Sequence, residues 1–439
     1  MATNRRDSSS NWGCMSATIG PESAIAAQLT GFFRAGVAAA SPAAVLPDQL
    51  PAGAARGRTL VLGCGKAAAA MAEVAAARLC GAVSGCVVTR HGHGARAATG
   101  AIAVIEANHP VPDARALAAG QTIRLLAESV RPGDRVVFLV SGGGSALLCD
   151  PIPGVTLAQK AAITDHLVRS GEAITAINLV RRHLSRVKGG RLAAAARAGE
   201  LHSFLISDVI GDDPAAIASG PSIAAPHDPE AALAVLARSG WPIERALATA
   251  MRALPAPDVP DHPVHIIASN ATARAATARA ASAAGWRVIA IDDDLAGEAR
   301  DAGAAHAALA LGHAARGERV LLLSGGELTV TVRSGFGGGG GPNLEYLAGM
   351  IAALPDGAPI SALAADSDGI DGTRDNAGGW FDPALARRAR PDTAAALASH
   401  GTHALFDRLG GLIVTGPTRT NVNDIRMIAV TPPRMVAAH

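Results

Sequence analysis

Three groups of residues in this chain place glycine beside a side chain that could do chemistry. The first is Ser141-Gly142-Gly143-Gly144-Ser145, which follows the buried apolar strand expected at 135–140. Glycines let a turn present consecutive backbone N–H groups to a ligand, because no Cβ stands in the way. A helix starting near Ser145 would point its positive end at the same place, which favours a phosphate or a carboxylate. Taken alone, the turn is better explained as a tight connection that binds nothing.

The second group is Gly63-Cys64-Gly65-Lys66, between an expected strand at 59–62 and an alanine-rich helix. It is not a dinucleotide-binding fingerprint, because Ala68 stands where the third glycine of G-x-G-x-x-G is needed. It also lacks the spacing of a Walker A loop and the Ser or Thr after the lysine. Lys66 is therefore a candidate for contacting an anion if neighbouring groups converge on it, and otherwise a solvated lysine.

The third group consists of carboxylates that follow expected strands. Asp208 stands after the strand at 202–207, and Asp366 opens a D-x-D-G-x-D run after the strand at 360–365. Ligands of open parallel sheets sit outside the carboxyl ends of the strands. These positions suit a base or a divalent cation, although the twelve-residue calcium frame is missing.

A basic segment and a glycine-rich loop add further candidates. Residues 173–198 are expected to be helical, with Arg182 and Arg186 one turn apart and a Lys188-Gly189-Gly190 break inside. A solvated basic face would explain the charges, but the two glycines favour function. Residues 335–341 are almost all glycine and are expected to form a mobile loop before a helix that Pro342 opens.

The order of the elements predicts the fold class. Strands and helices alternate along 439 residues, which indicates an α/β protein of two domains. Four prolines at 254–263 predict a linker, so we expect domains at 21–256 and 257–439. Residues 1–20 have no apolar segment of the kind found in signal peptides, and we expect a disordered tail.

Composition excludes several classes of function. The net charge is +2, with 39 basic and 37 acidic residues, which gives no argument for a nucleic-acid or membrane partner. Five cysteines without a C-x-x-C pair indicate a reduced protein with neither a disulfide framework nor a zinc site. No stretch reaches the roughly 18 apolar residues of a membrane span. We therefore expect a cytoplasmic location.

Taken together, the motifs resemble the glycerate 2-kinases of the MOFRL type, a family also labelled hydroxypyruvate reductase. The resemblance covers nearly the whole chain, from about residue 24 to residue 430. It is carried by GCGKAAAAM, VSGGGSALL, NLVRRHLSRVKGGRLA, SDVIGDDPAAIASGPS, SGGELTVTV, DSDGIDGTRDNAGG and TGPTRTNVNDIR.

The resemblance implies a larger, Rossmann-like N-terminal domain, a smaller MOFRL-type C-terminal domain and an active site in the cleft between them. It implies phosphorylation of the 2-hydroxyl of D-glycerate with ATP and Mg²⁺, giving 2-phosphoglycerate and ADP. Partners would be small molecules, and a homodimer stays open. Site residues expected on this basis are catalytic Lys66, Asp208 and Arg419; phosphate-binding Ser141, Gly142, Gly143, Gly144, Ser145, Gly340, Gly341 and Asn343; substrate-binding Gly65, Arg182, Lys188, Asn270 and Glu327; and metal-binding Asp208 and Asp366.

The chain departs from the family pattern at two positions. Pro342 replaces the arginine of G-G-R-N-x-E, and Arg419 stands in a loop that commonly reads G-P-T-G-T-N-V. Two interpretations of Arg419 have equal weight: it replaces the missing arginine, or it is a surface residue in a loop that tolerates a large side chain. Two other functions remain alternatives: an NAD(P)H-dependent hydroxypyruvate reductase, and a ligand-binding homologue with impaired catalysis.

Overall fold

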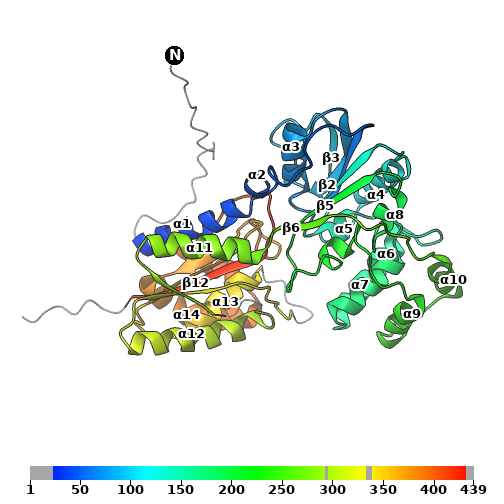
Figure 1. Cartoon of the computed structure of the whole chain (residues 1–439). Helices are drawn as coiled ribbons and strands as arrows, with labels where there is room; N and C mark the ends of the chain where they lie inside the picture. Colours follow the sequence, from blue (N-terminus) through cyan, green and yellow to red (C-terminus); the bar gives the residue numbers. More distant parts are fainter. Residues whose placement is uncertain (1–22, 292–294, 333–338, 432–439) are drawn as a thin grey trace, which may run out of the picture.

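The strands of this protein form two six-stranded sheets, each covered by helices. The computed structural model describes residues 23–291, 295–332 and 339–431. Figure 1 shows the two sheets and their helices as two bodies side by side. We call the sheet β1–β6 with helices α2–α10 the first unit, and the sheet β7–β12 with helices α1 and α11–α15 the second unit. The expected α/β class is confirmed.

The first sheet is entirely parallel, in the order β3-β2-β1-β4-β5-β6. Strand β4 is buried at every residue, as its continuous apolar run predicts for a strand covered on both faces. The strands are β1 Thr59–Cys64, β2 Val83–Arg90, β3 Ala101–Ala107, β4 Arg135–Ser141, β5 Glu200–Ile206 and β6 Val264–Ala268.

Three helices of the first unit, α4, α6 and α9, begin at residues whose side chains cap them. Asp113 caps α4 by accepting from the backbone N–H of Ala116, which confirms the expected cap. The expected helix at 173–198 is two helices, because residues 184–190 are not helical. The helices are α2 Pro42–Val45, α3 Ala68–Arg78, α4 Ala114–Glu128, α5 Gly144–Leu147, α6 Leu157–Arg169, α7 Ile174–His183, α8 Arg191–Ala195, the 3₁₀ turn η1 Ile217–Ser219, α9 Pro229–Arg238 and α10 Arg245–Ala253.

The second sheet is mixed, in the order β11-β10-β9-β12-β8-β7, with only β7 and β8 parallel to each other. Its strands are β7 Arg287–Ala290, β8 Val320–Ser324, β9 Ile360–Asp366, β10 Gly378–Phe381, β11 Leu412–Ile413 and β12 Asp424–Val430. Its helices are α1 Ala24–Ala39, α11 Asn270–Ala283, α12 Ala299–Ala315, α13 Pro342–Ala353, α14 Pro383–Ser399 and α15 Thr402–Leu409.

The expected boundary at residue 256 does not coincide with the border between the sheets. Strand β6 lies beyond the proline-rich stretch but pairs with β5 at the edge of the first sheet. Helix α1 begins the described chain but packs against α11 of the second unit. Prolines mark a connection without telling which sheet the next strand joins, and an amphipathic helix does not reveal its partner.

Two local expectations also change. The alternating residues 328–332 form no regular strand, and only Thr329 makes a bridge, with Glu298. Strand β10 was not expected, because two of its four residues are glycine. The expected tail at 1–20 and most of the glycine run at 335–341 lie outside the described residues.

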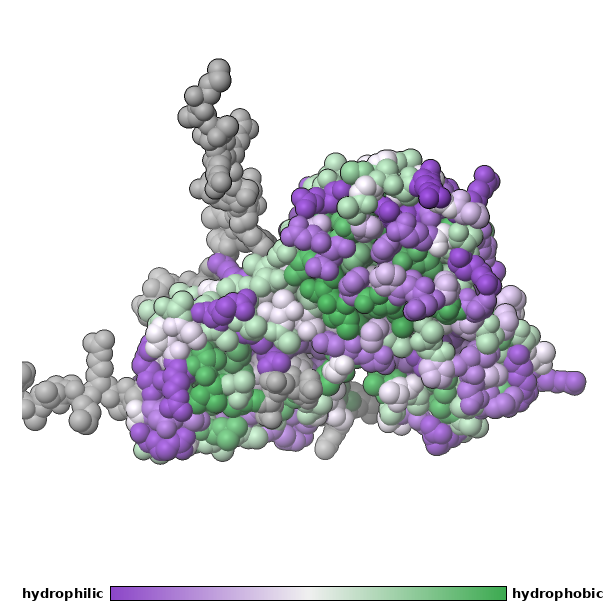
Figure 2. Space-filling view, viewed as in Figure 1, coloured by the Kyte–Doolittle hydropathy of each residue, from purple (hydrophilic) through white to green (hydrophobic). Residues whose placement is uncertain are grey.

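One hydrophobic core cluster continues from the α3 face of the first sheet into the second unit, and it includes Val61, Met71, Leu29 and Met427. The space-filling view shows hydrophilic side chains gathered at the outer ends of the two bodies (Figure 2). No helix among the described residues is long and apolar enough to cross a membrane.

Candidate active site

The glycine turn after β4 lies at the centre of the first sheet. Strand order reverses between β1 and β4, and ligands of such sheets bind outside the carboxyl ends at this point. Gly143 has φ of 76°, a left-handed conformation that favours glycine. The backbone N–H of Lys66 donates to the carbonyl of Gly142 (2.8 Å), so the turns after β1 and β4 are tied together. The structure thus brings two of the predicted glycine groups to one place.

Lys66 forms an ion pair with Asp368, which follows β9 of the second unit. The distance from Nζ to Oδ2 is 2.5 Å, and the two side chains are 13% and 1% exposed. Burial alone would lower the pKa of Lys66, but the carboxylates of Asp368, Asp366 and Asp208 outweigh it and raise that pKa. Lys66 is therefore charged and lies among carboxylates from both units.

Asp208 lies against the same glycine turn. A Cβ added at Gly142 would stand 1.9 Å from its Oδ2 atom, so the carboxylate occupies space that only glycine leaves free. The same Oδ2 accepts a hydrogen bond from Asn421 Nδ2 of the second unit at 2.9 Å. Burial raises the pKa of Asp208 even though Lys66 opposes the rise. A half-buried carboxylate of raised pKa, aimed at one place by an amide, is suited to accept a proton.

Further carboxylates increase the negative charge around Lys66. Burial, Asp368 and Asp424 raise the pKa of Asp366. Glu327 follows β8, and partial removal from water together with Asp208 and Asp424 raises its pKa to about 7. Among the described residues, no three or more His, Cys, Asp or Glu side chains form a group that could hold a metal ion by themselves.

The expected phosphate site at the start of α13 is filled by the protein itself. The carboxylate of Asp371 accepts from the backbone N–H groups of Asn343 (2.9 Å) and Leu344 (3.1 Å). The side-chain amide of Asn343 donates to Asp424 at 2.7 Å, and a Cβ added at Gly341 would meet Asp371. Two backbone N–H groups at the start of α13 therefore already have an acceptor within the protein. Phosphate binding by Gly340, Gly341 and Asn343 stays a prediction that these contacts do not support.

Asn270 serves the backbone of the second unit instead of facing a substrate. Its Nδ2 donates to the carbonyls of Val422 (2.7 Å) and Asp424 (2.9 Å), and its Oδ1 accepts from Arg274 Nε (2.7 Å). These bonds use both N–H groups of the amide and one of the two acceptor positions of its oxygen. Substrate binding by Asn270 stays a prediction, and in this arrangement Asn270 orders the segment that carries Asn421.

Lys188 lies near the glycine turn, since Ala218, which accepts from it, also contacts Gly144, whereas Arg182 lies beside Gly189. Lys188 is completely buried, and its Nζ donates to the carbonyl of Ala218 at 3.3 Å. Burial, then repulsion from Lys160, lowers its pKa to about 7. Burial also lowers the pKa of Arg182. Gly65 has φ of 118° and packs against Ser141, so it shapes the turn that carries Lys66.

Arg419 is paired and does not stand free. Its Nη2 donates to Glu73 Oε1 of α3 at 2.6 Å, and both side chains are mostly buried. Its φ is 66°, a left-handed conformation that favours glycine. The guanidinium reaches away from its own unit to the first one, so it holds the loop 415–423 in position.

Three important residues were not singled out from the sequence. Asp368 was seen only as part of an acidic run, because spacing does not tell which carboxylate turns inward. Asn421 was seen only as part of a loop. Asp371 belongs to the same acidic run and caps α13. Its hydrogen-bond partner Leu344 lies 27 residues earlier in the chain.

Family models match both parts of the chain. The domain of unknown function DUF4147 matches residues 28–254, and the MOFRL family matches residues 320–424. The first match contains Lys66, the glycine turn and Asp208, and the second contains Asp368 and Asn421. The residues that converge on the turn therefore come from both matched segments.

Similar proteins include kinases of known name. The chain is 36% identical to the glycerate 2-kinase of Pyrococcus horikoshii, over 86% of this chain and 89% of that one. It is 42% identical to an Agrobacterium vitis protein that bears a provisional hydroxypyruvate reductase name, over 92% and 94%.

Among solved structures, the glycerate kinase of Thermotoga maritima superimposes with a TM-score of 0.82 at 30% identity. The match covers 93% of this chain and 99% of that one. The family expected from the motifs is thereby confirmed. The chain belongs to the glycerate kinase family defined by the DUF4147 and MOFRL segments.

Proposed function

We propose that this protein transfers the γ-phosphoryl group of ATP to the 2-hydroxyl of D-glycerate, at the place where the two units meet. One observation carries the proposal: Asp208 and the Lys66–Asp368 ion pair converge on Gly142 and Gly143. Phosphoryl transfer needs backbone N–H groups and a cation at the phosphates, and a carboxylate at the attacking hydroxyl. The site offers each of these groups.

Asp208 is the proposed general base. Its raised pKa brings it closer to the working pH, and Asn421 fixes the orientation of its carboxylate. Lys66 is the proposed partner of the transferring phosphoryl group, since it stays charged although buried. Asp368 keeps the lysine in place across the junction.

Mg²⁺ fits the chemistry of this site. Burial and neighbouring carboxylates raise the pKa values of Asp208, Asp366 and Glu327. Negative charge near Lys66 therefore exceeds what the lysine can neutralise, and a cation would be attracted there. Magnesium is commonly held by one or two carboxylates together with substrate phosphates. Asp366 would hold it together with substrate phosphates, and Asp208 would be a second ligand only if it is not the base. The ion would neutralise charge that develops on the phosphoryl oxygens.

A nucleotide-binding role for the first unit has further support. The order β3-β2-β1-β4-β5-β6 is that of the Rossmann fold, so we propose a Rossmann-like unit. The same order would suit the alternative, an NAD(P)H-dependent hydroxypyruvate reductase. However, Ser141 Oγ accepts from the backbone N–H of Ala67 (3.0 Å), at the start of α3 where a pyrophosphate would bind. The kinase is therefore favoured.

The test is to supply D-glycerate, ATP and Mg²⁺ and to identify the products. We expect ADP and 2-phosphoglycerate, which enolase dehydrates directly, whereas 3-phosphoglycerate first needs a mutase. Consumption of NAD(P)H with hydroxypyruvate would establish the reductase instead. Absence of both reactions would leave the impaired homologue, the alternative that Pro342 raises.

A further inference from the structure

A small cavity opens beside the glycine turn, on the side of Ser145. Its volume is about 150 Å³, and the residues that line it include His109, Gly143, Ser145, Lys160 and Arg181. They come from the segment before α4, from the turn and α5, and from helices α6 and α7. The cavity is thus built from the first unit only.

Two cations line this cavity without a carboxylate to balance them. Lys160 is 4% exposed, and its Nζ donates only to the thiol of Cys149, at 3.4 Å. Arg181 donates to Asn178 Oδ1 at 3.4 Å. A thiol and an amide are weak partners for full charges. No acidic side chain is found among the described residues that line the cavity.

Neighbouring groups leave the positive charge uncompensated. Burial, then repulsion from Lys160, with a smaller contribution from Arg181, lowers the pKa of Lys188 to about 7. Burial, then the charge of Lys66, lowers the pKa of His109 to about 3, so its ring is neutral at pH 7. Isolated buried charges are costly, and a bound anion would remove that cost.

The cavity and the reacting groups share one turn. A Cβ at Gly143 would contact both His109 Nε2 (3.1 Å) and Lys66 Cγ (3.2 Å). The carboxylate of Asp208 lies against Gly142, the residue that precedes Gly143. Ser145 and Ser219 are hydrogen-bonded at 2.7 Å, and Ser219 donates to Asn178, the partner of Arg181. An anion in the cavity would therefore extend its other atoms along the turn towards Asp208.

We propose that Lys160 and Arg181 bind the carboxylate of a short hydroxy acid and thereby select acids over neutral polyols as substrates. Pockets for drug-sized ligands measure roughly 300–1,000 Å³. At about 150 Å³ the cavity suits the carboxylate end of a three-carbon acid and not a nucleotide. Naming the acid as glycerate rests on the function proposed above.

The experiment compares Lys160→Met and Arg181→Met with Arg169→Met. Arg169 is a matched control, because it lies on α6 like Lys160 but its side chain is 79% exposed. Binding of D-glycerate, of its neutral amide glyceramide and of ADP is measured by calorimetry without turnover. We expect each cavity variant to weaken glycerate binding by about tenfold or more, since charge-assisted hydrogen bonds are lost. Arg169→Met should bind like the wild type.

ADP and glyceramide show whether the cavity binds a carboxylate or a phosphate. ADP affinity should stay within about twofold in the cavity variants, and wild type should bind glyceramide at least about tenfold more weakly than glycerate. Weaker ADP binding with unchanged glycerate binding would make the cavity a phosphate site and overturn the proposal. Unchanged binding of both ligands would overturn it as well.

Turnover distinguishes this proposal from the proposed function. Phosphorylation of glycerate by all variants at wild-type KM would support the kinase and refute the carboxylate site. Carboxylate binding that depends on Lys160, in a protein without kinase activity, would support the carboxylate site and refute the kinase.

Thermal unfolding excludes a merely structural role. Lys160→Met should unfold at the wild-type temperature or above, because it removes an unpaired buried charge. A large drop in unfolding temperature together with lost binding would refute the proposal.

Discussion

Asp208 owes its properties to three neighbours on different segments of the chain. Gly142 gives it room, Asn421 orients it, and Lys66 partly offsets the burial that raises its pKa. No one of these contacts lies within the residues that flank Asp208 in the sequence. The reactivity proposed for this carboxylate is thus a product of the tertiary structure.

We predict that Asp208→Asn lowers turnover of D-glycerate by about 10²–10⁴-fold, the usual loss for an acid–base group. The unfolding temperature should not fall, because the amide fills the same space without a buried charge. Asp213→Asn, in the same loop, is the control and should keep its activity. Steady-state kinetics and thermal unfolding of both variants check this, and turnover within about threefold of wild type would contradict the assignment.

Asp371 gives a prediction about pH. Burial raises its pKa from the ordinary 3.8 to about 7. The folded protein therefore binds this proton more tightly than the unfolded chain does, and the free energy of unfolding falls as pH rises between those values. Above about pH 7 this contribution no longer changes.

Asp371→Asn removes this titration and keeps one oxygen, so one of the two N–H groups, of Asn343 or of Leu344, loses its acceptor at every pH. We expect urea unfolding to show a larger loss of stability from about pH 5 to about pH 8 in the wild type than in the variant. Other titrating groups act equally in both proteins, so the difference isolates Asp371. Equal losses would show that its pKa is not raised.

At the scale of elements, the loop 415–423 is held to α3 by the pair of Arg419 and Glu73. The left-handed backbone at Arg419 costs about 1–2 kcal/mol relative to glycine, so a compensating contact is expected, and the 2.6 Å ion pair is that contact. The same loop carries Asn421, which contacts Asp208. The pair thereby acts on the site through the loop.

We predict that Arg419→Gly and Glu73→Gln change turnover by similar factors, and that the double variant is no worse than either, because both remove the same ion pair. Glutamine keeps an oxygen for the backbone N–H groups of Arg96 and Ala97, which also bond to Glu73. Turnover of the three variants under saturating substrates checks this. A large loss in Arg419→Gly alone, with Glu73→Gln unaffected, would revive a direct role of this arginine in phosphoryl transfer.

Most elements could be predicted from the sequence, whereas several roles could not. The runs at β1, β4 and β9 are apolar and end in glycine or acidic residues, so local pattern and burial agree. Lys66 and Asp208 were found because both follow such strands. The contact of Asn343 with Asp371 could not be predicted, since a helix start accepts an anion of the protein as readily as a phosphate, and only the fold reveals that Asp371 is there.

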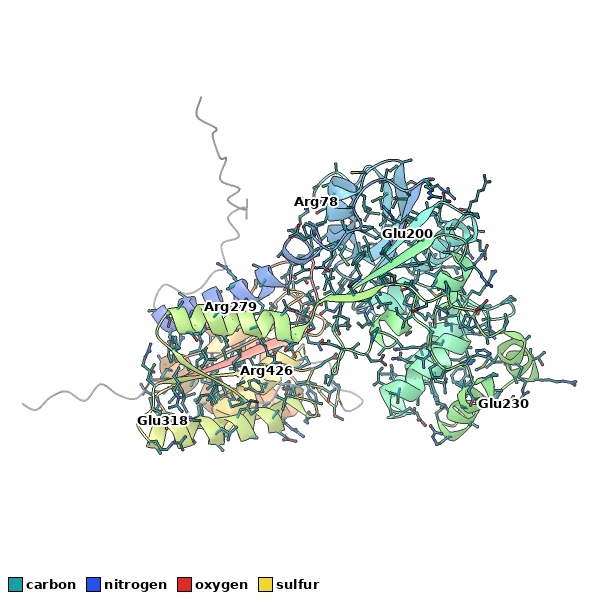
Figure 3. The ribbon with its side chains drawn as sticks, in the orientation of Figure 1. Arg78, Glu200, Glu230, Arg279, Glu318 and Arg426 are labelled. Atoms are coloured by element: carbon teal, nitrogen blue, oxygen red, sulfur yellow. The ribbon has the colours of Figure 1, made fainter. Side chains whose placement is uncertain are left out.

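At the scale of the whole molecule, the described chain begins and ends in the second unit. Helix α1 packs on α11, where Thr277 donates to the carbonyl of Phe32 (3.4 Å) and Trp286 donates to Gln28 (3.0 Å). A Cβ at Gly36 would stand 2.4 Å from Thr277 Oγ1, so the two helices approach closely. Figure 1 shows α1 lying beside α11, while Arg426 of β12 lies inside the same body in Figure 3.

We predict that residues 269–431 produced alone do not fold stably, since the α11 surface that buries Leu29 and Phe33 is then exposed. Adding a peptide of residues 23–41 should raise the yield of folded fragment and its unfolding temperature, measured by circular dichroism. A peptide with Phe33→Asp is the control. A fragment that is equally stable without the peptide would show that α1 is dispensable for the second unit.

This connectivity also determines how the protein would respond to mechanical force. The described chain passes from α1 through the whole first unit before it returns at α11 and finishes at β12. Tension applied to the two ends of the described chain is borne first by contacts inside the second unit, among them α1 on α11. Strands β1 and β6 feel the load only after those contacts have broken. The first unit therefore bears little of the force at first. The second unit, which contains both ends of the described chain, is expected to unfold first.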